Sequence, residues 1–405
     1  MVTRGTWMVG SGGLTPEQRQ VVGLNVNSNQ LVFGPAGSGK TLLLLHRAQY
    51  LTTQYNIVPN RIRVLVFTNV LKKYIQSGIE SLCLPTDVVQ TFYSWVSDLA
   101  KQLHVPVPQG ADDDNRYQRK LKAVLAYIER KPMSPLLDVA LVDEGQDLPA
   151  EAYRLLKHLS RHVTVFADYA QQLYDDGAHV SEIAGILGVS RESMVLLCDL
   201  RTSRDVAKVA ARFLQPDEAE RYLRTRRPPD KPGERRIPVL FRATTFNDEW
   251  DYLASVVAQE IHDNRRVGIL VPENYLVYLV HKQLGGRGVS VVKVERFGKV
   301  NFNELSPKVL TVHSAKGLTF DTVLMPEIAP RWYNPSKQPV EPLLFVGITR
   351  ARNWVCLLTT RGREIAELSR LQSLIDEGVL IEKTSQRPAG TGQPPVIDPY
   401  EDMPL

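Results

Sequence analysis

The chain has 405 residues, of which 43% are hydrophobic and 23% charged, so it is long and apolar enough for two packed domains. Its net charge of +5 permits a nucleic-acid partner without requiring one. Three widely spaced cysteines indicate neither a disulfide framework nor a zinc site. The sequence contains no long apolar run that would predict a membrane span. We therefore expect a soluble, cytoplasmic protein.

The N-terminal segment, residues 1–13, is rich in glycine and is predicted to be flexible. A helix is expected to follow, because Thr15 is a suitable N-cap and Pro16 suits the first helical position. Gln18 lies one turn inside this helix, and its amide can hydrogen-bond to adenine. Taken alone, an ordinary surface glutamine is the better interpretation of this residue.

The next stretch, residues 34–41, carries the strongest signal in the chain. It reads G-x-x-x-x-G-K-T, between the apolar run 31–33 and a helix predicted to end near Tyr50, and its residues are Gly34, Pro35, Ala36, Gly37, Ser38, Gly39, Lys40 and Thr41. Glycines let backbone amides approach phosphate oxygens, and the helix N-terminus favours negative charge. Lys40 is expected to bind the β- and γ-phosphates, and Thr41 to bind Mg²⁺. The pattern therefore predicts a nucleotide site.

Two adjacent carboxylates follow the apolar run 139–142. In an open parallel sheet, ligands bind at the carboxyl ends of the strands. Asp143 is therefore predicted to bind Mg²⁺, and Glu144 to deprotonate the attacking water. A pair of helix-capping acids is the alternative, which the nearby phosphate loop disfavours.

The remaining predicted strands alternate with helices, which indicates an α/β fold with a doubly wound sheet followed by a second α/β domain. The strands are expected near residues 63–69, 88–95, 163–168, 194–198, 239–241, 267–271, 289–294, 309–312, 322–325 and 354–358. The charge runs between 95 and 137 are interpreted as solvated faces. Domain limits of 14–198 and 199–385 are predicted, with a Pro-rich disordered tail at 386–405.

Taken in order, these stretches resemble the motifs of the UvrD/Rep group of superfamily 1 helicases. The matching stretches are 14–18, 34–41, 67–69, 91–94, 143–147, 167–171, Arg201, 311–318 and 345–352. The resemblance implies two tandem RecA-like (P-loop NTPase) domains, with the nucleotide in the cleft between them.

The resemblance also implies roles for individual residues. Gln171 would link the γ-phosphate to the nucleic acid, Arg201 and Arg350 would neutralise charge during hydrolysis, and Gly317 would lie at the nucleotide. Surface arginines are the alternative, which the motif settings disfavour. The expected nucleic-acid contacts are Phe67, Asn69, Thr91, Phe92, Ser94, Tyr174, His313 and Ser314.

The chain departs from the group at several positions. Leu42 and Leu200 stand where an arginine and a tyrosine usually hold the base, and Thr319 replaces a glutamate expected at the ribose. Residues 175–177 replace an arginine and a stacking aromatic, and the segments that build two accessory domains are nearly absent. We therefore expect a bare two-domain motor with relaxed nucleotide selectivity.

The function expected from the sequence is an ATP- and Mg²⁺-dependent single-stranded DNA translocase or helicase, with 3′→5′ polarity by resemblance. The alternative is a regulatory NTPase that controls a partner protein such as a nuclease without unwinding DNA. A metabolic kinase is disfavoured, because Asp143, Glu144 and Arg350 suit attack by water. The sequence leaves DNA and RNA open as partners, since the expected contacts are to backbone and base faces.

Overall fold

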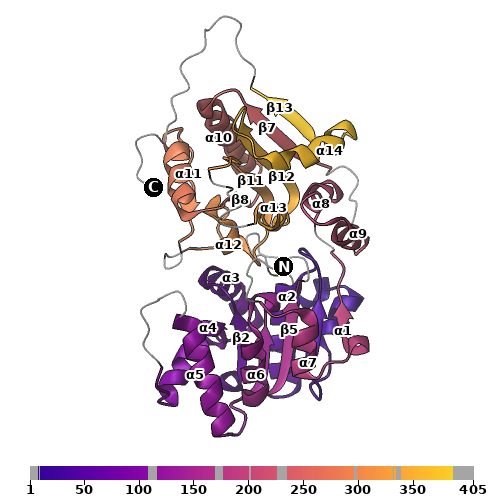
Figure 1. Cartoon of the computed structure of the whole chain (residues 1–405), viewed down its shortest axis with the longest axis vertical. Helices are drawn as coiled ribbons and strands as arrows, with labels where there is room; N and C mark the ends of the chain where they lie inside the picture. The colour runs from indigo at the N-terminus through magenta and orange to yellow at the C-terminus, as the bar shows by residue number, and fades with distance from the viewer. Residues whose placement is uncertain are drawn as a thin grey trace, which may run out of the picture.

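The computed structural model describes residues 8, 10–107, 116–168, 177–199, 202–225, 235–295, 298, 300–331, 333 and 339–385. They form two α/β domains arranged one above the other along the long axis of the molecule (Figure 1). Every strand pair in both sheets is parallel. The predicted fold class of two tandem α/β domains is therefore confirmed.

The first sheet has the strand order β3-β2-β4-β5-β1-β6. Its strands are β1 (Gln30–Phe33), β2 (Ile62–Val66), β3 (Val89–Thr91), β4 (Leu137–Val142), β5 (Ser160–Ala167) and β6 (Val195–Leu196). Its helices are α1 (Pro16–Val22), α2 (Lys40–Gln54), α3 (Asn69–Ile79), α4 (Phe92–Gln102), α5 (Arg116–Arg130), α6 (Ala150–Leu159) and α7 (Val180–Leu187).

The first sheet is covered on both faces, which explains why its strands are continuous apolar runs. In β1, Val32 packs in the cluster that includes α2 and α3, whereas Leu31 and Phe33 pack in the cluster that includes α4 to α7. Successive side chains of a strand point to opposite faces, so a four-residue strand serves two cores.

Capping residues fix two of the helix starts that matter for function. Thr15 Oγ1 accepts a hydrogen bond from Gln18 N at 3.2 Å, and Gln18 Oε1 accepts one from Thr15 N at 3.0 Å. This capping box confirms the predicted start of α1. The predicted strand at 88–95 is only partly correct, because Thr91 Oγ1 accepts from Ser94 N at 3.2 Å and starts α4 at Phe92.

The second sheet has the order β13-β7-β12-β11-β8-β10-β9. Its strands are β7 (Val239–Ala243), β8 (Val267–Val271), β9 (Val292–Lys293), β10 (Lys308–Thr311), β11 (Phe320–Met325), β12 (Ala351–Thr360) and β13 (Ile381–Thr384). The helices of this half of the chain are α8 (Arg204–Ala211), α9 (Pro216–Arg224), α10 (Phe246–His262), α11 (Asn274–Gly285), α12 (Val312–Ala315), α13 (Val340–Ile348) and α14 (Gln372–Asp376).

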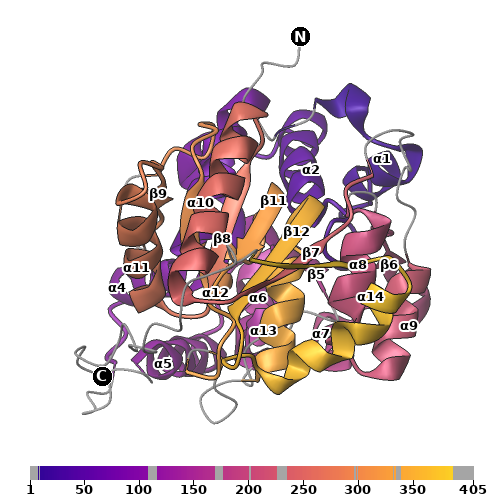
Figure 2. The same ribbon diagram turned by 90° about the horizontal axis from the view of Figure 1, so that it is seen from above.

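Crossovers in the second sheet run in two directions, so its helices cover both faces. The β7-α10-β8 and β8-α11-β9 connections move one way along the sheet, whereas β11-α13-β12 moves the other way. Right-handed crossovers therefore put α10 and α11 on one face and α13 on the opposite face, as the view from above shows (Figure 2). Among the described residues, no helix is long and apolar enough to cross a membrane.

Candidate active site

The phosphate loop connects the end of β1 to the start of α2. Gly34 N donates a hydrogen bond to Ala167 O at 3.1 Å, which ties the loop to β5. Gly37 and Gly39 have φ values of +86° and +85°, a region that strongly favours glycine. A Cβ atom at Gly37 would also lie 2.3 Å from Asp199 Oδ1. The glycines are therefore needed for both the backbone conformation and the close packing of the loop.

Lys40 points back across this loop. Its ammonium group donates to Gly34 O at 2.7 Å and to Pro35 O at 3.1 Å, and lies 3.5 Å from the carboxylate of Asp168. Lys40 is only 7% exposed. Its charge is thus fixed at the centre of the loop, where the β- and γ-phosphates of a nucleotide bind in P-loop proteins.

Thr41 and Asp143 form an oxygen pair beside the lysine. Thr41 Oγ1 donates to Asp143 Oδ2 at 2.7 Å, and Asp143 is fully buried. Burial and the neighbouring Glu144 raise the pKa of Asp143 to about 7. Mg²⁺ in nucleotide sites takes one or two protein oxygens and completes its shell with phosphates and water. These residues fit that mode, and the described part of the chain has no group of three His, Cys, Asp or Glu that could hold a resident metal.

Glu144 follows in the left-handed conformation, with φ of +51°, and lines a pocket together with Lys40 and Thr41, referred to below as the nucleotide pocket. Burial opposes its ionisation, but Lys40, Lys316 and Arg350 together hold the pKa of its carboxyl below the ordinary value. Gln146 Nε2 donates to Glu144 Oε2 at 2.7 Å and fixes its orientation. An ionised, oriented carboxylate can accept a proton from water.

The second domain completes this pocket. Gly317, Thr319 and Arg350 line it together with Lys40, Thr41 and Glu144 of the first domain. Arg350 is 4% exposed, and its Nε donates to Val346 O at 3.0 Å. Gly317 has φ of +79°, and a Cβ atom there would lie 2.7 Å from Leu71 of α3. The pocket therefore lies between the two domains.

A buried ion pair, which the sequence did not reveal, joins the domains behind this pocket. Lys316 Nζ lies 2.6 Å from Asp147 Oδ1, and the two side chains are 3% and 0% exposed. Burial raises the pKa of Asp147 to about 7 in spite of the lysine. The pair links the carboxylate segment 143–147 to the segment 311–318.

Gln18, the residue expected to contact adenine, lies next to the phosphate loop but outside the pocket lining. Gln18 lies beside the phosphate loop, with Nε2 3.2 Å from the position of a Cβ at Gly39, but its Oε1 is used in the cap of α1. Leu42 lines the pocket, and so does Tyr74, which was not predicted. The Tyr74 ring stands perpendicular to that of Phe302, with centroids 5.4 Å apart. Tyr74 was missed because nothing in its local sequence marks it.

Three predicted residues, Gln171, Tyr174 and Arg201, lie outside the described residues, and so does Leu200. Their roles stay predictions. Asp199 and Thr202, which flank residues 200 and 201, are joined by a hydrogen bond. Thr202 N donates to Asp199 Oδ1 at 3.0 Å. Asp199 and Thr202 both pack against Gly37 of the phosphate loop.

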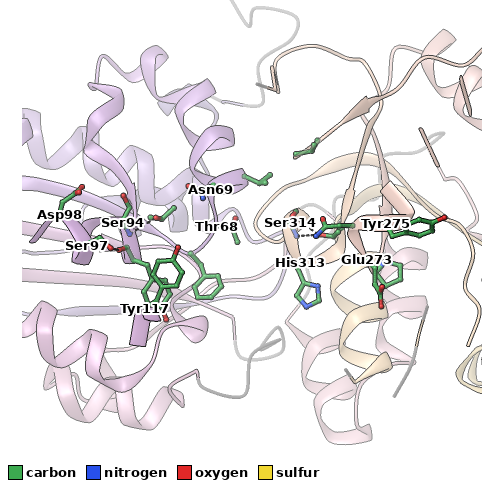
Figure 3. A pocket seen from close by; sticks show the side chains of 18 of the residues that line it. Thr68, Asn69, Ser94, Ser97, Asp98, Tyr117, Glu273, Tyr275, His313 and Ser314 are labelled. Carbon is green, nitrogen blue, oxygen red and sulfur yellow. Dashed lines mark hydrogen bonds between the residues drawn. The ribbon is translucent and has the colours of Figure 1, made fainter. Parts of the chain in front are cut away.

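A larger cleft, of about 1070 Å³, also lies between the domains. Figure 3 shows Asn69 and Ser94 on one wall and His313 and Ser314 on the other. The lining includes six predicted nucleic-acid contacts, Phe67, Asn69, Thr91, Ser94, His313 and Ser314, and the unpredicted Tyr93, Asp98, Lys101, Tyr117, Glu273 and Tyr275.

Phe92 is the exception among the predicted contacts that the structure describes. It is fully buried, with its ring centroid 6.0 Å from that of Trp95, so the prediction that Phe92 contacts a strand directly is wrong. As the first residue of α4 it turns into the core, whereas Tyr93 faces the cleft.

Comparison with known proteins gives two family matches. Residues 14–107 match the UvrD/REP helicase N-terminal domain, and residues 308–358 match the UvrD-like helicase C-terminal domain. These matches confirm the resemblance to UvrD/Rep helicases. Neither match covers α5 or α11.

Individual relatives match over shorter stretches. The ATP-dependent DNA helicase PcrA of Bacillus subtilis is 34% identical over 85 residues, which are 20% of this chain and 11% of that protein. A probable DNA helicase II homolog of Mycoplasma capricolum is 29% identical over 91 residues, which are 22% of this chain and 13% of that protein. The matches thus span only a small part of these relatives.

One solved structure is the C-terminal domain of a possible DNA helicase from Lactobacillus plantarum WCFS1. It covers 46% of this chain and 99% of its own, with 16% identity and a TM-score of 0.36.

Proposed function

We propose that this chain, which carries UvrD/REP-type N-terminal and UvrD-like C-terminal helicase domains, hydrolyses ATP to move along single-stranded DNA. One observation carries this proposal: hydrolytic groups of both domains line a single pocket. Lys40 and Glu144 come from the first domain and Arg350 from the second. Hydrolysis would then require the two domains to be closed on the nucleotide, which is what a motor needs.

The proposed chemistry assigns one task to each side chain. Thr41 and Asp143 would hold Mg²⁺, which when bound neutralises charge on the phosphates. Glu144 would accept a proton from the attacking water, because its lowered pKa keeps the carboxyl group ionised. Lys40 and Arg350 would stabilise the charge that develops on the γ-phosphate. Gln171 and Arg201 are proposed to complete this set, with Gln171 linking the phosphate to the strand.

One short segment, residues 311–319, supports coupling between hydrolysis in the nucleotide pocket and the shape of the large cleft. His313 and Ser314 line the cleft, whereas Gly317 and Thr319 line the nucleotide pocket. The segment begins at the end of β10, where Thr311 Oγ1 accepts from Ser314 N at 3.1 Å. A movement of this segment on hydrolysis would therefore change the cleft wall. The proposed 3′→5′ polarity rests on the family resemblance.

The experiment that tests the proposal is ATP hydrolysis with and without a single-stranded oligonucleotide, using DNA and RNA of the same sequence. Turnover is expected to rise severalfold or more with DNA, and Lys40→Ala is expected to abolish it in both conditions. Turnover that ignores both nucleic acids would contradict the proposal. If only RNA stimulates turnover, RNA would replace DNA as the proposed substrate.

A further inference from the structure

The wall of the large cleft in the first domain carries a row of aromatic side chains. Phe67 follows β2, Tyr93 lies in the first turn of α4, and Tyr117 lies in the first turn of α5. The ring centroids of Phe67 and Tyr93 are 6.1 Å apart, and those of Tyr93 and Tyr117 are 5.3 Å apart. Tyr117 is 42% exposed, so the end of the row is accessible. Aromatic rings in such a position can stack with any nucleobase.

Positive charge gathers beside the exposed end of this row. Lys101 lines the cleft at the end of α4, and Lys120 Nζ donates to Ser97 Oγ of the same wall at 2.9 Å. Burial lowers the pKa of Lys120, and the nearby Arg116 and Lys101 lower it further. Asp98, 3.8 Å from Lys101, is the carboxylate that opposes them among the described residues. Among the described residues, three cations therefore lie beside one carboxylate in this part of the wall.

The opposite wall has a different character. Figure 3 shows Tyr275 and Glu273 across the cleft from Tyr117. Burial lowers the pKa of His313, and Lys316 lowers it further, so the imidazole facing the cleft is neutral at physiological pH. Among the described residues that line the cleft, the lysine therefore comes from the wall formed by α4 and α5.

We propose that Tyr117, Lys101 and Lys120 form a binding lip for single-stranded nucleic acid, in which a base stacks on Tyr117 and neighbouring phosphates bind the two lysines. This inference rests on the proposed function and adds contacts that the comparisons do not assign, because Tyr117 and Lys120 lie outside both matched family segments. The segment before β4, where the group carries an accessory domain, thus contributes to the strand path.

The test is the equilibrium binding of a fluorescein-labelled oligothymidine, followed by fluorescence anisotropy at several salt concentrations. Tyr117→Ala is expected to weaken binding by roughly 5- to 150-fold, as expected for one stacked base. Tyr117→Phe is expected to bind normally, because the ring provides the stacking. The matched control is Tyr55→Ala, since Tyr55 is 43% exposed and lies 6.1 Å from the Tyr50 ring but does not line the cleft.

The lysines are tested by the salt dependence of the same binding. Each phosphate contact on a single strand contributes about 0.7 to the slope of log K against log salt. Lys101→Ala with Lys120→Ala is therefore expected to reduce that slope by about 1.4, whereas Tyr117→Ala leaves it unchanged. The control pair is Lys131→Ala with Lys157→Ala, two exposed lysines outside the cleft lining.

The outcomes separate this inference from the proposed function. If the unaltered chain binds no oligonucleotide, the proposed function fails and the lip fails with it. If the unaltered chain binds but Tyr117→Ala matches Tyr55→Ala, or the lysine pair leaves the slope unchanged, the lip is wrong and the proposed function stands.

Discussion

Replacement of Lys316 by methionine should shift the two domains towards an open arrangement. Lys316 and Asp147 belong to different domains, and their charged atoms are 2.6 Å apart in a fully buried setting. Lys316 contacts Asp147 Oδ1, and Asp147 Oδ2 has no hydrogen-bond partner among the described residues. Without the lysine, closure would bury an unpaired carboxyl group, so the cost falls on the closed state.

The size of this effect follows from the burial. Removing one partner of a buried ion pair costs about 3–5 kcal/mol when the other charge is left behind. Burial already raises the pKa of Asp147 to about 7, so the carboxyl group can take up a proton instead of remaining charged. Because protonation removes the stranded charge, we expect a cost at the lower end of that range, about 3 kcal/mol. This cost corresponds to a roughly 100-fold change in the ratio of closed to open chains.

Domain closure can be followed by energy transfer between two dyes. One dye is placed on the exposed Cys83 of the first domain and the other on Ser255→Cys, an exposed position of α10. Cys198 is replaced by alanine in this background because it is half-buried, whereas the buried Cys356 can remain. The transfer efficiency is expected to fall in Lys316→Met.

The matched control is Arg370→Met, which breaks an ion pair with Glu341 of 2.8 Å within the second domain. Both of these side chains are partly exposed, so no change in energy transfer is expected. Asp147→Asn combined with Lys316→Met should recover part of the energy-transfer efficiency, because closure then buries no unpaired carboxyl group. Equal transfer in Lys316→Met and the unaltered chain would refute the reasoning.

Four further variants test the site and the fold. Glu144→Gln should bind nucleotide normally but lower kcat by about 10²- to 10⁴-fold, and near-normal kcat would remove Glu144 as the base. Arg350→Ala should lower kcat by about 10³-fold or more with little change in nucleotide affinity, measured by single-turnover hydrolysis and nucleotide titration. Gln18→Ala should reduce the preference for ATP over GTP, expected to be about 10- to 100-fold at most, in a competition assay; unchanged selectivity would mean that another group reads the base. Burial and Glu327 raise the pKa of Glu249 to about 8, so the folded state binds the extra proton and loses stability as pH rises through that value. The melting temperature should therefore fall as the pH rises from the ordinary glutamate value of 4.5 to about 8, and by less in Glu249→Gln.

The predicted site residues that the structure brings together share a local cause. The phosphate loop needs glycines at fixed positions and a strand before it, and both signals lie within a dozen residues of Lys40. Asp143 and Glu144 follow a buried strand directly. Because parallel strands end at the same edge, adjacent motifs were brought together as expected.

The features that were missed depend on partners far away in the chain. Lys316 and Asp147 are 169 residues apart, and neither local sequence indicates that they pair. Tyr117 reads as part of a charged helix, and its place at the cleft follows only from the packing of α5 against α4. β13 was not predicted because this edge strand is exposed along its whole length and lacks an apolar pattern.

The central claim, that ATP hydrolysis drives movement along single-stranded DNA, is tested most directly by displacement of streptavidin from biotinylated oligonucleotides. With ATP, the chain is expected to remove streptavidin from the 5′ end faster than from the 3′ end, and Glu144→Gln is expected to remove it from neither. DNA-stimulated hydrolysis without displacement from either end would contradict the motor and would favour the regulatory NTPase.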